Sequence, residues 1–188
     1  EQLAILLASL EHQNYPNFEV IVVVGPTEDN TLEVLAAYAD RVQVLRCPDA
    51  NLSRSRNLGL LAAHGEIVAF TDDDAVPCRT WLSQLVALLT DPGIACTGGC
   101  VYDVHPAQPA LQHRLGVVSN LGEQGNVRNG RAEPLPDGMG KVWTERPMGA
   151  NMAFRRADLL AIGGFDEFYE WVRSTGYAGS TQQSIVAT

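Results

Sequence analysis

Short runs rich in β-branched residues alternate with helical segments through the first hundred residues, and this alternation constrains the fold more than any other feature. Strands are predicted over residues 18–24, 42–45, 66–71 and 94–97. Helices are predicted over residues 2–10, 31–39, 53–63 and 79–89. Strands and helices that alternate over short loops favour parallel pairing with right-handed crossovers. The sequence therefore predicts an α/β fold: an open, mostly parallel sheet with flanking helices.

Local signals refine the limits of these elements. The run 18–24 is apolar enough for a strand buried on both faces. Thr27 and Asp29 are suitable caps for the helix 31–39, and Ser53 is a suitable cap for the helix that follows it. Residues expected on buried helix faces are Leu32, Leu35, Ala36 and Ala39 in the second helix, and Trp81, Leu82, Leu85, Leu88 and Leu89 in the fourth.

The second half of the chain has much less pattern. Residues 98–145 lack periodicity, which is typical of a functional loop region or of disorder. The sequence next predicts a strand over 149–154, a helix over 156–162 and a turn over 163–166. Residues 171–188 form a tail in which no pattern predicts a helix or a strand.

Composition excludes several classes of protein. The chain has 188 residues, enough for one domain, and 13 basic against 22 acidic residues give a net charge of −9. That charge disfavours non-specific binding to nucleic acid or anionic lipid. No apolar run reaches the roughly 18 to 20 residues of a membrane span, and the first residues do not resemble a signal peptide. We therefore expect no transmembrane segment and a cytoplasmic location, with the four cysteines as buried, reduced thiols.

Three consecutive carboxylates, Asp72, Asp73 and Asp74, follow the predicted strand 66–71. Like charges in contact raise one another's pKa unless a positive group joins them. Hard oxygen ligands without nearby His or Cys favour Mg²⁺ or Mn²⁺, which often completes its coordination with substrate phosphates. Ligands also bind at the carboxyl ends of strands in open α/β sheets. The pattern favours a metal-held phosphate ligand, and a solvated turn that caps the next helix is the alternative.

A second polar segment, residues 51–57, enters the helix before that strand and is expected at the same sheet edge. Its Arg54 and Arg56 are suited to neutralise phosphate, because guanidinium binds phosphate oxygens well. An ordinary surface arginine is the alternative for each.

These segments resemble glycosyltransferase family 2. Residues 50–74 read ANLSRSRNLGLLAAHGEIVAFTDDD and are followed by AVP and WL. The family pattern is an Ala-Arg-Asn-rich helix, Ala-x-Gly-Glu, an apolar strand, Asp-x-Asp, then Pro and Trp-Leu. Residues 18–31 (FEVIVVVGPTEDNT) and 149–167 (GANMAFRRADLLAIGGFDE) also resemble family segments. The resemblance covers roughly residues 1–167 and implies a GT-A fold, similar to that of other nucleotide-diphospho-sugar transferases.

The resemblance implies roles for the aspartates. Asp72 and Asp74 match the outer residues of Asp-x-Asp, and Asp74, with Asp72, would coordinate the Mg²⁺ or Mn²⁺ that bridges the diphosphate. Asp73 could exchange roles with either, since the family also uses adjacent aspartates. The implied activity is metal-assisted, inverting transfer of a sugar from a nucleotide-diphosphate donor to an acceptor hydroxyl.

Other positions take roles from the same resemblance. Thr27 and Asp29 would line the nucleotide pocket, although Asp29 is also explained as a helix cap. Arg56 and Asn57 match the family's Arg-Asn pair, which shapes the pocket or contacts the nucleotide sugar. The segment under the donor sugar and acceptor comprises Gly149, Ala150 and Asn151.

The sequence also departs from the family pattern. The family's first strand would precede Glu1, and Gly25 stands where many members carry an aspartate that reads the base. The general base is an aspartate, usually in a Glu-Asp pair, yet only Glu170 follows the Gly-Gly-Phe-Asp-Glu turn. The catalytic base is therefore not identified. We expect a fragment that is incomplete at both ends and exposes a central strand edge.

The expected organisation is one family 2-like domain over residues 1–170, followed by the tail 171–188. Within it, residues 1–100 would bind the nucleotide sugar and residues 101–170 would form the acceptor side. The family implies a carbohydrate or lipid-linked acceptor, a role in polysaccharide biosynthesis, and a full-length protein that is peripheral at the cytoplasmic membrane face. Two alternatives are a non-catalytic remnant that binds nucleotide or a partner, and a sugar-phosphate nucleotidyltransferase. The latter would open with a glycine-rich, basic phosphate loop, and none is visible.

Overall fold

The computed structural model describes residues 2–99, 101–103, 110–113, 116–119, 127–128, 131–132, 149–168 and 184–187. The helices are α1 (Gln2–Glu11), α2 (Thr31–Ala36), α3 (Leu52–Ala62), α4 (Trp81–Leu89) and α5 (Arg156–Ala161). The strands of the main sheet are β1 (Val20–Val24), β2 (Gln43–Arg46), β3 (Ile67–Asp72), β4 (Ile94–Gly98), β7 (Gly116–Ser119), β10 (Met152–Arg155) and β11 (Ser184–Ala187). Two small hairpins pair β5 (Val101–Asp103) with β6 (Ala110–His113), and β8 (Val127–Arg128) with β9 (Arg131–Ala132).

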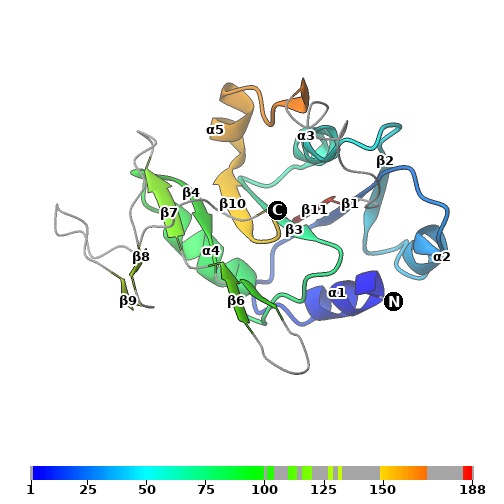
Figure 1. Ribbon diagram of the computed structural model, residues 1–188, viewed down its shortest axis with the longest axis horizontal. Coiled ribbons are helices and arrows are strands. Elements are labelled where there is room, and N and C mark those ends of the chain that lie inside the picture. Colours follow the sequence, from blue (N-terminus) through cyan, green and yellow to red (C-terminus); the bar gives the residue numbers. More distant parts are fainter. Residues whose placement is uncertain are drawn as a thin grey trace.

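The main sheet has the strand order β2-β1-β11-β3-β10-β4-β7 (Figure 1). The strands predicted from the first hundred residues, β1, β2, β3 and β4, all run in one direction, as the alternation with helices indicates. The strands β11, β10 and β7 run antiparallel to their neighbours. The α/β class is confirmed, and the sheet is mixed because later segments insert between the parallel strands.

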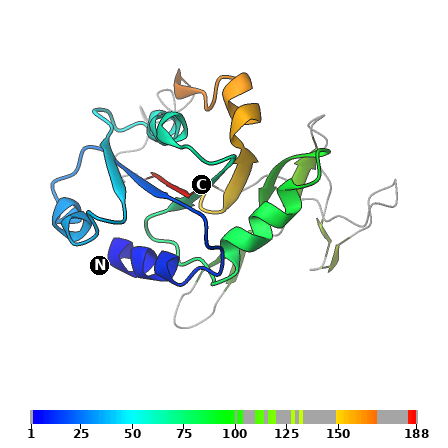
Figure 2. The ribbon, with the colours of Figure 1, turned by 180° about the vertical axis from the view of Figure 1, so that it is seen from behind.

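Helices cover both faces of this sheet. Figures 1 and 2 place α1 and α4 on one face and α3 and α5 on the other. Strand β1 is buried along its whole length and alternates between the two layers. Val20, Val22 and Val24 pack with α1 and α4, while Ile21 and Val23 pack with the buried leucines of α3 and α5. This two-sided burial explains why the strand is a continuous apolar run.

Several local predictions are wrong in detail. Leu32, Ala36 and Ala39 are exposed, and of the predicted face of α2 only Leu35 is buried, because this short helix lies at the edge of the sheet beside β2 (Figure 1). Leu88 is also exposed, on the outer side of α4. The N-cap of α3 is Asn51, whose Oδ1 accepts a hydrogen bond from the Arg54 N–H at 2.9 Å. Ser53 is instead buried inside the helix.

The C-terminal strand β11 is the largest departure from the sequence analysis. It lies between β1 and β3, where a central strand edge was expected to be exposed. Ser184 pairs in register with Val23 and Asp72, and Ala187 pairs with Val20 and Ala69. The tail therefore contributes a strand to the middle of the sheet.

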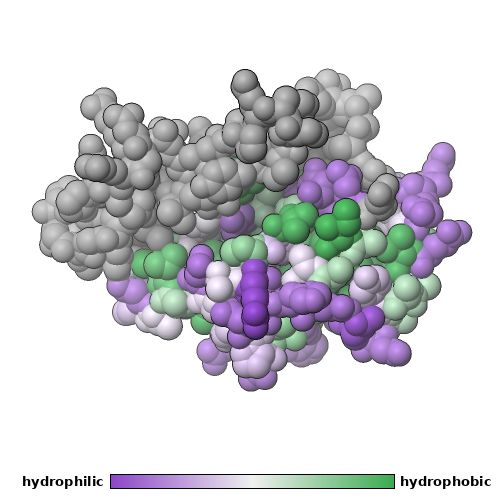
Figure 3. Space-filling view, turned by 90° about the horizontal axis from the view of Figure 1, so that it is seen from below, coloured by the Kyte–Doolittle hydropathy of each residue, from purple (hydrophilic) through white to green (hydrophobic). Residues whose placement is uncertain are grey.

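Seen from below, the α1 and α4 side shows small hydrophobic patches separated by hydrophilic side chains (Figure 3). Among the helices described, none is both long and apolar enough to cross a membrane.

Cys47 and Cys96 are buried and free, and burial raises the pKa of Cys96 to about 12. Cys78 is free but exposed, contrary to the prediction, and Cys100 lies outside the described residues.

Candidate functional site

The aspartate triplet lies where β3 ends. Asp72 is the last residue of the strand, and its carbonyl accepts a hydrogen bond from the Ala75 N–H at 3.1 Å, which closes a turn. Asp72 and Asp73 are half-buried, whereas Asp74 is exposed. A strand end followed by a tight turn thus holds three adjacent carboxylates at the carboxyl edge of the sheet.

The described residues do not balance the negative charge of this triplet. Burial raises the pKa of Asp72, the Arg56 guanidinium opposes that shift, and Asp74 adds to it. Burial also raises the pKa of Asp73, as do the negative charges of Asp74, Asp72 and Asp29, against one opposing backbone hydrogen bond. Two half-buried carboxylates therefore resist ionisation, and a cation would relieve that repulsion.

Among the described residues, Arg56 is a basic side chain that faces the triplet. Its Nη2 lies 3.8 Å from Asp72 Oδ1, its side chain is only 12% exposed, and its guanidinium lies 5.6 Å from the Phe165 ring centroid. A Cβ atom at Gly149 would lie 2.3 Å from the same Nη2. Glycine at position 149 therefore makes room for Arg56. Arg54, by contrast, forms an exposed ion pair with Asp49.

Asn57 serves a structural purpose beside Arg56. Its Nδ2 donates to the Phe165 carbonyl and to Glu167 Oε1, both at 2.9 Å, and its Oδ1 accepts from the Phe165 N–H at 2.8 Å. Gly164 has a φ of +77°, and a Cβ atom there would lie 2.5 Å from Asn57 Oδ1. The Asn57 side chain thus fixes the turn after α5 against α3. These contacts favour the pocket-shaping role over direct contact with a ligand.

Thr27 and Asp29 form the loop between β1 and α2. Asp29 Oδ1 accepts hydrogen bonds from Thr27 Oγ1 at 2.8 Å and from the Thr31 N–H at 2.9 Å. The hydrogen bonds from Thr31, followed by that from Thr27, lower the pKa of Asp29. The N-cap position of α2 is Asn30, so neither Thr27 nor Asp29 is the N-cap residue, but the Asp29 carboxylate accepts the first N–H of the helix. It also lies near enough to contribute to the raised pKa of Asp73, so this loop and the triplet share one edge.

The segment before β10 lies on the other side of the triplet. Asn151 Oδ1 accepts a hydrogen bond from Trp81 Nε1 at 2.8 Å, and a Cβ atom at Gly99 would lie 2.5 Å from Asn151 Nδ2. Neither contact was predictable from the sequence, because they join residues 70 and 52 positions apart and no local pattern connects them. The Trp-Leu pair after the triplet was the available signal for Trp81.

No group of three or more His, Cys, Asp or Glu side chains that could hold a metal converges within the described part of the chain. Glu170, the nearest carboxylate after the Gly-Gly-Phe-Asp-Glu turn, lies outside that part. Glu167 is inside it and accepts its hydrogen bond from Asn57. Within the described residues, the edge therefore offers carboxylates from two loops and one half-buried arginine, without a complete cage of protein ligands for a metal.

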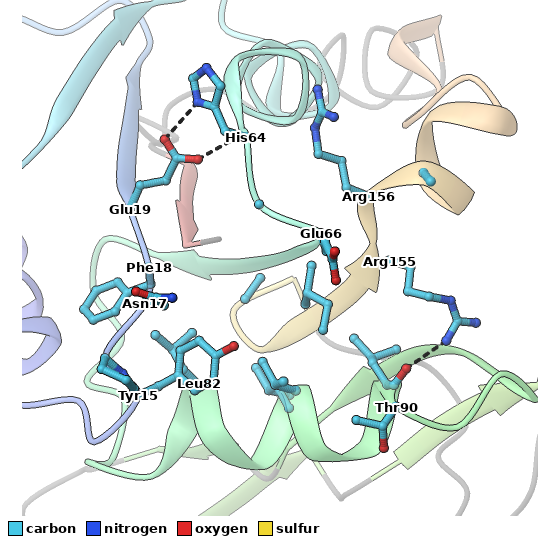
Figure 4. Close-up of a pocket in the computed structure, with 18 residues that line it drawn as sticks. Tyr15, Asn17, Phe18, Glu19, His64, Glu66, Leu82, Thr90, Arg155 and Arg156 are labelled. Atoms are coloured by element: carbon cyan, nitrogen blue, oxygen red, sulfur yellow. Dashed lines mark hydrogen bonds and ion pairs between the residues drawn. The ribbon is translucent and has the colours of Figure 1, made fainter.

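A separate cavity of about 1000 Å³ opens at the other end of the strands (Figure 4). Its lining includes Phe18 and Glu19 before β1, Glu66 and Ile67 at the start of β3, and Leu85 of α4. No residue of the aspartate triplet lines it.

A profile of the family described as Glycosyl transferase family 2 matches residues 1–162 of the chain. The chain belongs to glycosyltransferase family 2. Its architecture is the GT-A fold of these enzymes.

Two solved structures share this fold. A mannosyltransferase from Pyrobaculum calidifontis, PcManGT, in complex with GDP-Man and Mn²⁺, matches with a TM-score of 0.60 and 24% identity. It covers 89% of this chain and 45% of its own. Residues 1–349 of TarS from S. aureus match with a TM-score of 0.62 and 20% identity, over 88% of this chain and 46% of that one. At these identities the likeness concerns the fold.

A curated relative extends the comparison. The glucosyl-dolichyl phosphate glucuronosyltransferase of Haloferax volcanii is 27% identical over 170 residues, which are 88% of this chain and 51% of that protein. The family 2 chain described here thus spans about half the length of this relative and of the two solved structures.

Proposed function

We propose that this family 2 chain binds a nucleotide-diphosphate sugar and a divalent cation at the carboxyl edge of β3, as the donor side of an inverting glycosyltransferase. One observation carries the proposal. Two half-buried carboxylates at that edge have a raised pKa, and among the described residues their charged neighbours are two further carboxylates and one arginine. Such a site gains free energy when a cation enters it.

The residues present fit Mg²⁺ or Mn²⁺. Their donors are hard carboxylate oxygens, which these ions prefer to the softer ligands of zinc. Because fewer than three metal-ligating side chains converge within the described residues, oxygen atoms of the diphosphate would complete the coordination. Asp74, exposed at the mouth of the site, and Asp72 would hold the ion. The presence of Mn²⁺ and GDP-Man in PcManGT supports this assignment.

Residues around the proposed metal site would have separate roles in binding the donor. A bound cation would neutralise charge on the departing nucleoside diphosphate. Arg56 keeps a positive charge beside Asp72, which favours the ionised carboxylate that a metal needs. Asp73 can take the place of either neighbour. Thr27 and Asp29 form the adjacent loop wall of the nucleotide pocket.

On the acceptor side, Gly149, Ala150 and Asn151 would lie under the donor sugar and the acceptor hydroxyl. Trp81 orients Asn151, and Gly99 leaves room for it. Inversion requires a base that deprotonates the acceptor for attack at the anomeric carbon. The same proposal includes a carbohydrate or lipid-linked acceptor and a role in polysaccharide biosynthesis. It also includes attachment of the full protein to the cytoplasmic membrane face.

Calorimetric titration of UDP and GDP, with and without Mn²⁺, tests the donor site. We expect binding that depends on Mn²⁺ and weakens at least tenfold in Asp74→Ala. Asp40→Ala, which removes an exposed carboxylate beyond the end of α2, is the matched control and should bind as the unmodified chain does. Binding that is equal in the two variants, or that needs no metal, would contradict the proposed site.

The second candidate is a non-catalytic nucleotide-binding remnant. It is favoured by one observation: within the described residues after the Gly-Gly-Phe-Asp turn, the carboxylate of Glu167 is engaged by Asn57. Incubation with a radiolabelled UDP- or GDP-sugar separates the two candidates. Metal-dependent binding with release of nucleoside diphosphate supports the enzyme, and binding without release supports the remnant. The family match gives no support to a nucleotidyltransferase.

A further inference from the structure

A cluster of three aromatic rings lies beside the aspartate triplet. The Phe165 ring is edge-on to Phe70 at a centroid distance of 5.2 Å, and edge-on to Phe154 at 6.0 Å. Phe70 is buried in β3, two residues before Asp72. Side chains two residues apart on a strand point to the same face of the sheet, so Asp72 shares a face with Phe70. The ring cluster therefore lies on the face that α3 and α5 cover, next to the candidate site.

The Phe165 ring also contacts the arginine that faces the triplet. The Arg56 guanidinium carbon lies over this ring, 5.6 Å from its centroid, while Arg56 Nη2 lies 3.8 Å from Asp72 Oδ1. A cation within about 6 Å of a ring centroid is attracted to the ring face, and the attraction grows as water is excluded. The Arg56 side chain is only 12% exposed. The guanidinium thus has a ring on one side and a carboxylate on another.

The position of the Phe165 ring is itself fixed from α3. Asn57, which follows Arg56 in that helix, binds the Phe165 backbone twice: its Oδ1 accepts from the N–H at 2.8 Å and its Nδ2 donates to the carbonyl at 2.9 Å. The absence of a side chain at Gly149 leaves the space that Arg56 Nη2 occupies. An arginine side chain loses much rotamer freedom when it is ordered. A ring in a fixed place reduces that freedom before any ligand binds.

We propose that Phe165 is a positioning residue of the donor site, whose ring holds the Arg56 guanidinium toward Asp72. The inference rests on the proposed function, because it concerns the same nucleotide-sugar and cation site. Phe165 touches neither ligand and acts through Arg56. Without the ring, the guanidinium samples more conformations, and ordering it on ligand binding weakens the affinity of the site.

Phe154 provides a matched control for Phe165. Both rings are half-buried, pack against the same core cluster and lie edge-on to a neighbouring ring. Within the described residues, the ring found over the Arg56 guanidinium is that of Phe165. Leucine in either place removes a ring and retains an apolar side chain. A general loss of packing should therefore affect both variants, whereas a loss of Arg56 positioning should affect Phe165→Leu alone.

Calorimetric titration of UDP and GDP with Mn²⁺ tests the proposal on Phe165→Leu, Phe154→Leu, Arg56→Gln and the double variant Arg56→Gln/Phe165→Leu. We expect Phe165→Leu to weaken Mn²⁺-dependent binding roughly fivefold and Phe154→Leu to leave it unchanged, although both lower the urea midpoint. In the Arg56→Gln background, Phe165→Leu should have no further effect, because the group that it positions is absent. Unchanged binding by Phe165→Leu, equal weakening by Phe154→Leu, or an additive loss in the double variant overturns the proposal.

A measurement without ligand distinguishes failure of this inference from failure of the proposed function. In nitrogen–proton correlation spectra, the Arg56 Nε–H signal is the one lost in Arg56→Gln. Because a ring face shifts the resonance of a proton placed over it, this signal should move in Phe165→Leu and not in Phe154→Leu. If the unmodified chain binds neither nucleotide, the proposed function fails, and the contact between Phe165 and Arg56 is still decided by this signal.

An Arg56 signal that is unchanged in Phe165→Leu, or that moves equally in Phe154→Leu, overturns the inference. Far-UV circular dichroism establishes whether each variant is folded. Phe165→Met, which fills a similar volume without a ring, replaces Phe165→Leu in both measurements if the leucine variant does not fold.

Discussion

The two ends of β3 differ in how their charges are arranged. At the carboxyl end, Asp72 and Asp73 are half-buried with a raised pKa, and within the part of the chain that the structure describes one arginine, Arg56, faces them. At the amino end, Glu19 pairs with His64, and the Glu66 carbonyl accepts the Arg156 N–H at 2.8 Å. A cavity of about 1000 Å³ lies at the amino end, yet the unbalanced charge lies at the other. Under the proposed function, electrostatic imbalance is therefore a better guide to the ligand site than cavity volume.

Arg155 lies near the amino end of β3 and Arg56 near its carboxyl end, so substituting each one tests the contrast between the two ends. Arg155 near the amino end donates to the carbonyls of Leu89, Asp91 and Ile94 at 3.0, 3.2 and 2.5 Å. Arg155→Gln should lower the free energy of unfolding by roughly 3 kcal/mol, because it leaves several carbonyls without a charged donor. Urea denaturation measures this loss. Nucleotide affinity of the folded variant should not change, and a parallel loss of affinity would show that the two ends are coupled.

Substituting the glycines of the turn after α5 tests how much the contact with Asn57 contributes to stability. Gly164→Ala combines a φ of +77° with a Cβ position 2.5 Å from Asn57 Oδ1, so we expect a loss of roughly 2 to 3 kcal/mol. Gly163→Ala is the matched control, because its φ is +86° but nothing lies within 4 Å of the added Cβ. That change should cost only about 1 kcal/mol. Thermal unfolding compares the two, and equal losses would mean that the Asn57 contact is unimportant.

Much of the fold was predictable because it depends on local patterns. Helix and strand periodicity located every element of the first hundred residues, and the helix and turn after β10 also followed from local signals. The strand β11 was not predictable, because four residues carry little periodicity and their position depends on partners more than a hundred residues away. The exposure of Leu32 likewise depends on the position of α2 at the sheet edge.

The candidate site likewise has features that follow from local sequence and features that depend on the folded chain. The triplet and its position at a strand end follow from the sequence, because a buried strand must end where the carboxylates begin. The pairing of Arg56 with Asp72, and the need for glycine at position 149, involve segments that meet only in the folded chain. The assignment of metal and nucleotide contacts to individual aspartates remains a prediction.

Arg56→Gln, at the carboxyl end of β3, is the counterpart of Arg155→Gln at the amino end. Removing the guanidinium deprives Asp72 of the group that lowers its pKa, so the carboxylate becomes harder to ionise. We expect Mn²⁺-dependent nucleotide affinity to fall roughly tenfold, which corresponds to about 1.4 kcal/mol. Calorimetry measures this change. If Arg56→Gln instead lost stability as Arg155→Gln does and kept its affinity, Arg56 would be a packing residue.

Asp73→Asn should stabilise the protein at neutral pH. The pKa of Asp73 is higher in the folded protein than its ordinary value of 3.8, so ionised Asp73 costs stability above the folded pKa. The gain from asparagine should be about 1 kcal/mol or less, because solvent screens a half-exposed group. As the pH falls through the folded pKa and below 3.8, the gain should disappear. Urea denaturation at pH 7 and at pH 3.5 measures both values, and a gain that persists at low pH would assign the effect to packing.

The smallest effect is expected from the carboxylate at the amino end. Glu19 Oε2 lies 3.2 Å from His64 Nδ1, but the His64 side chain is 83% exposed, and exposed ion pairs contribute about 0 to 1 kcal/mol. Glu19→Gln keeps an acceptor for the His64 N–H, which donates to Glu19 Oε1 at 2.7 Å. We therefore expect a loss below about 1 kcal/mol in urea and no change in nucleotide affinity. A larger loss of stability would mean that charge at the amino end matters as much as charge beside the triplet, and the contrast between the two ends of β3 would no longer hold.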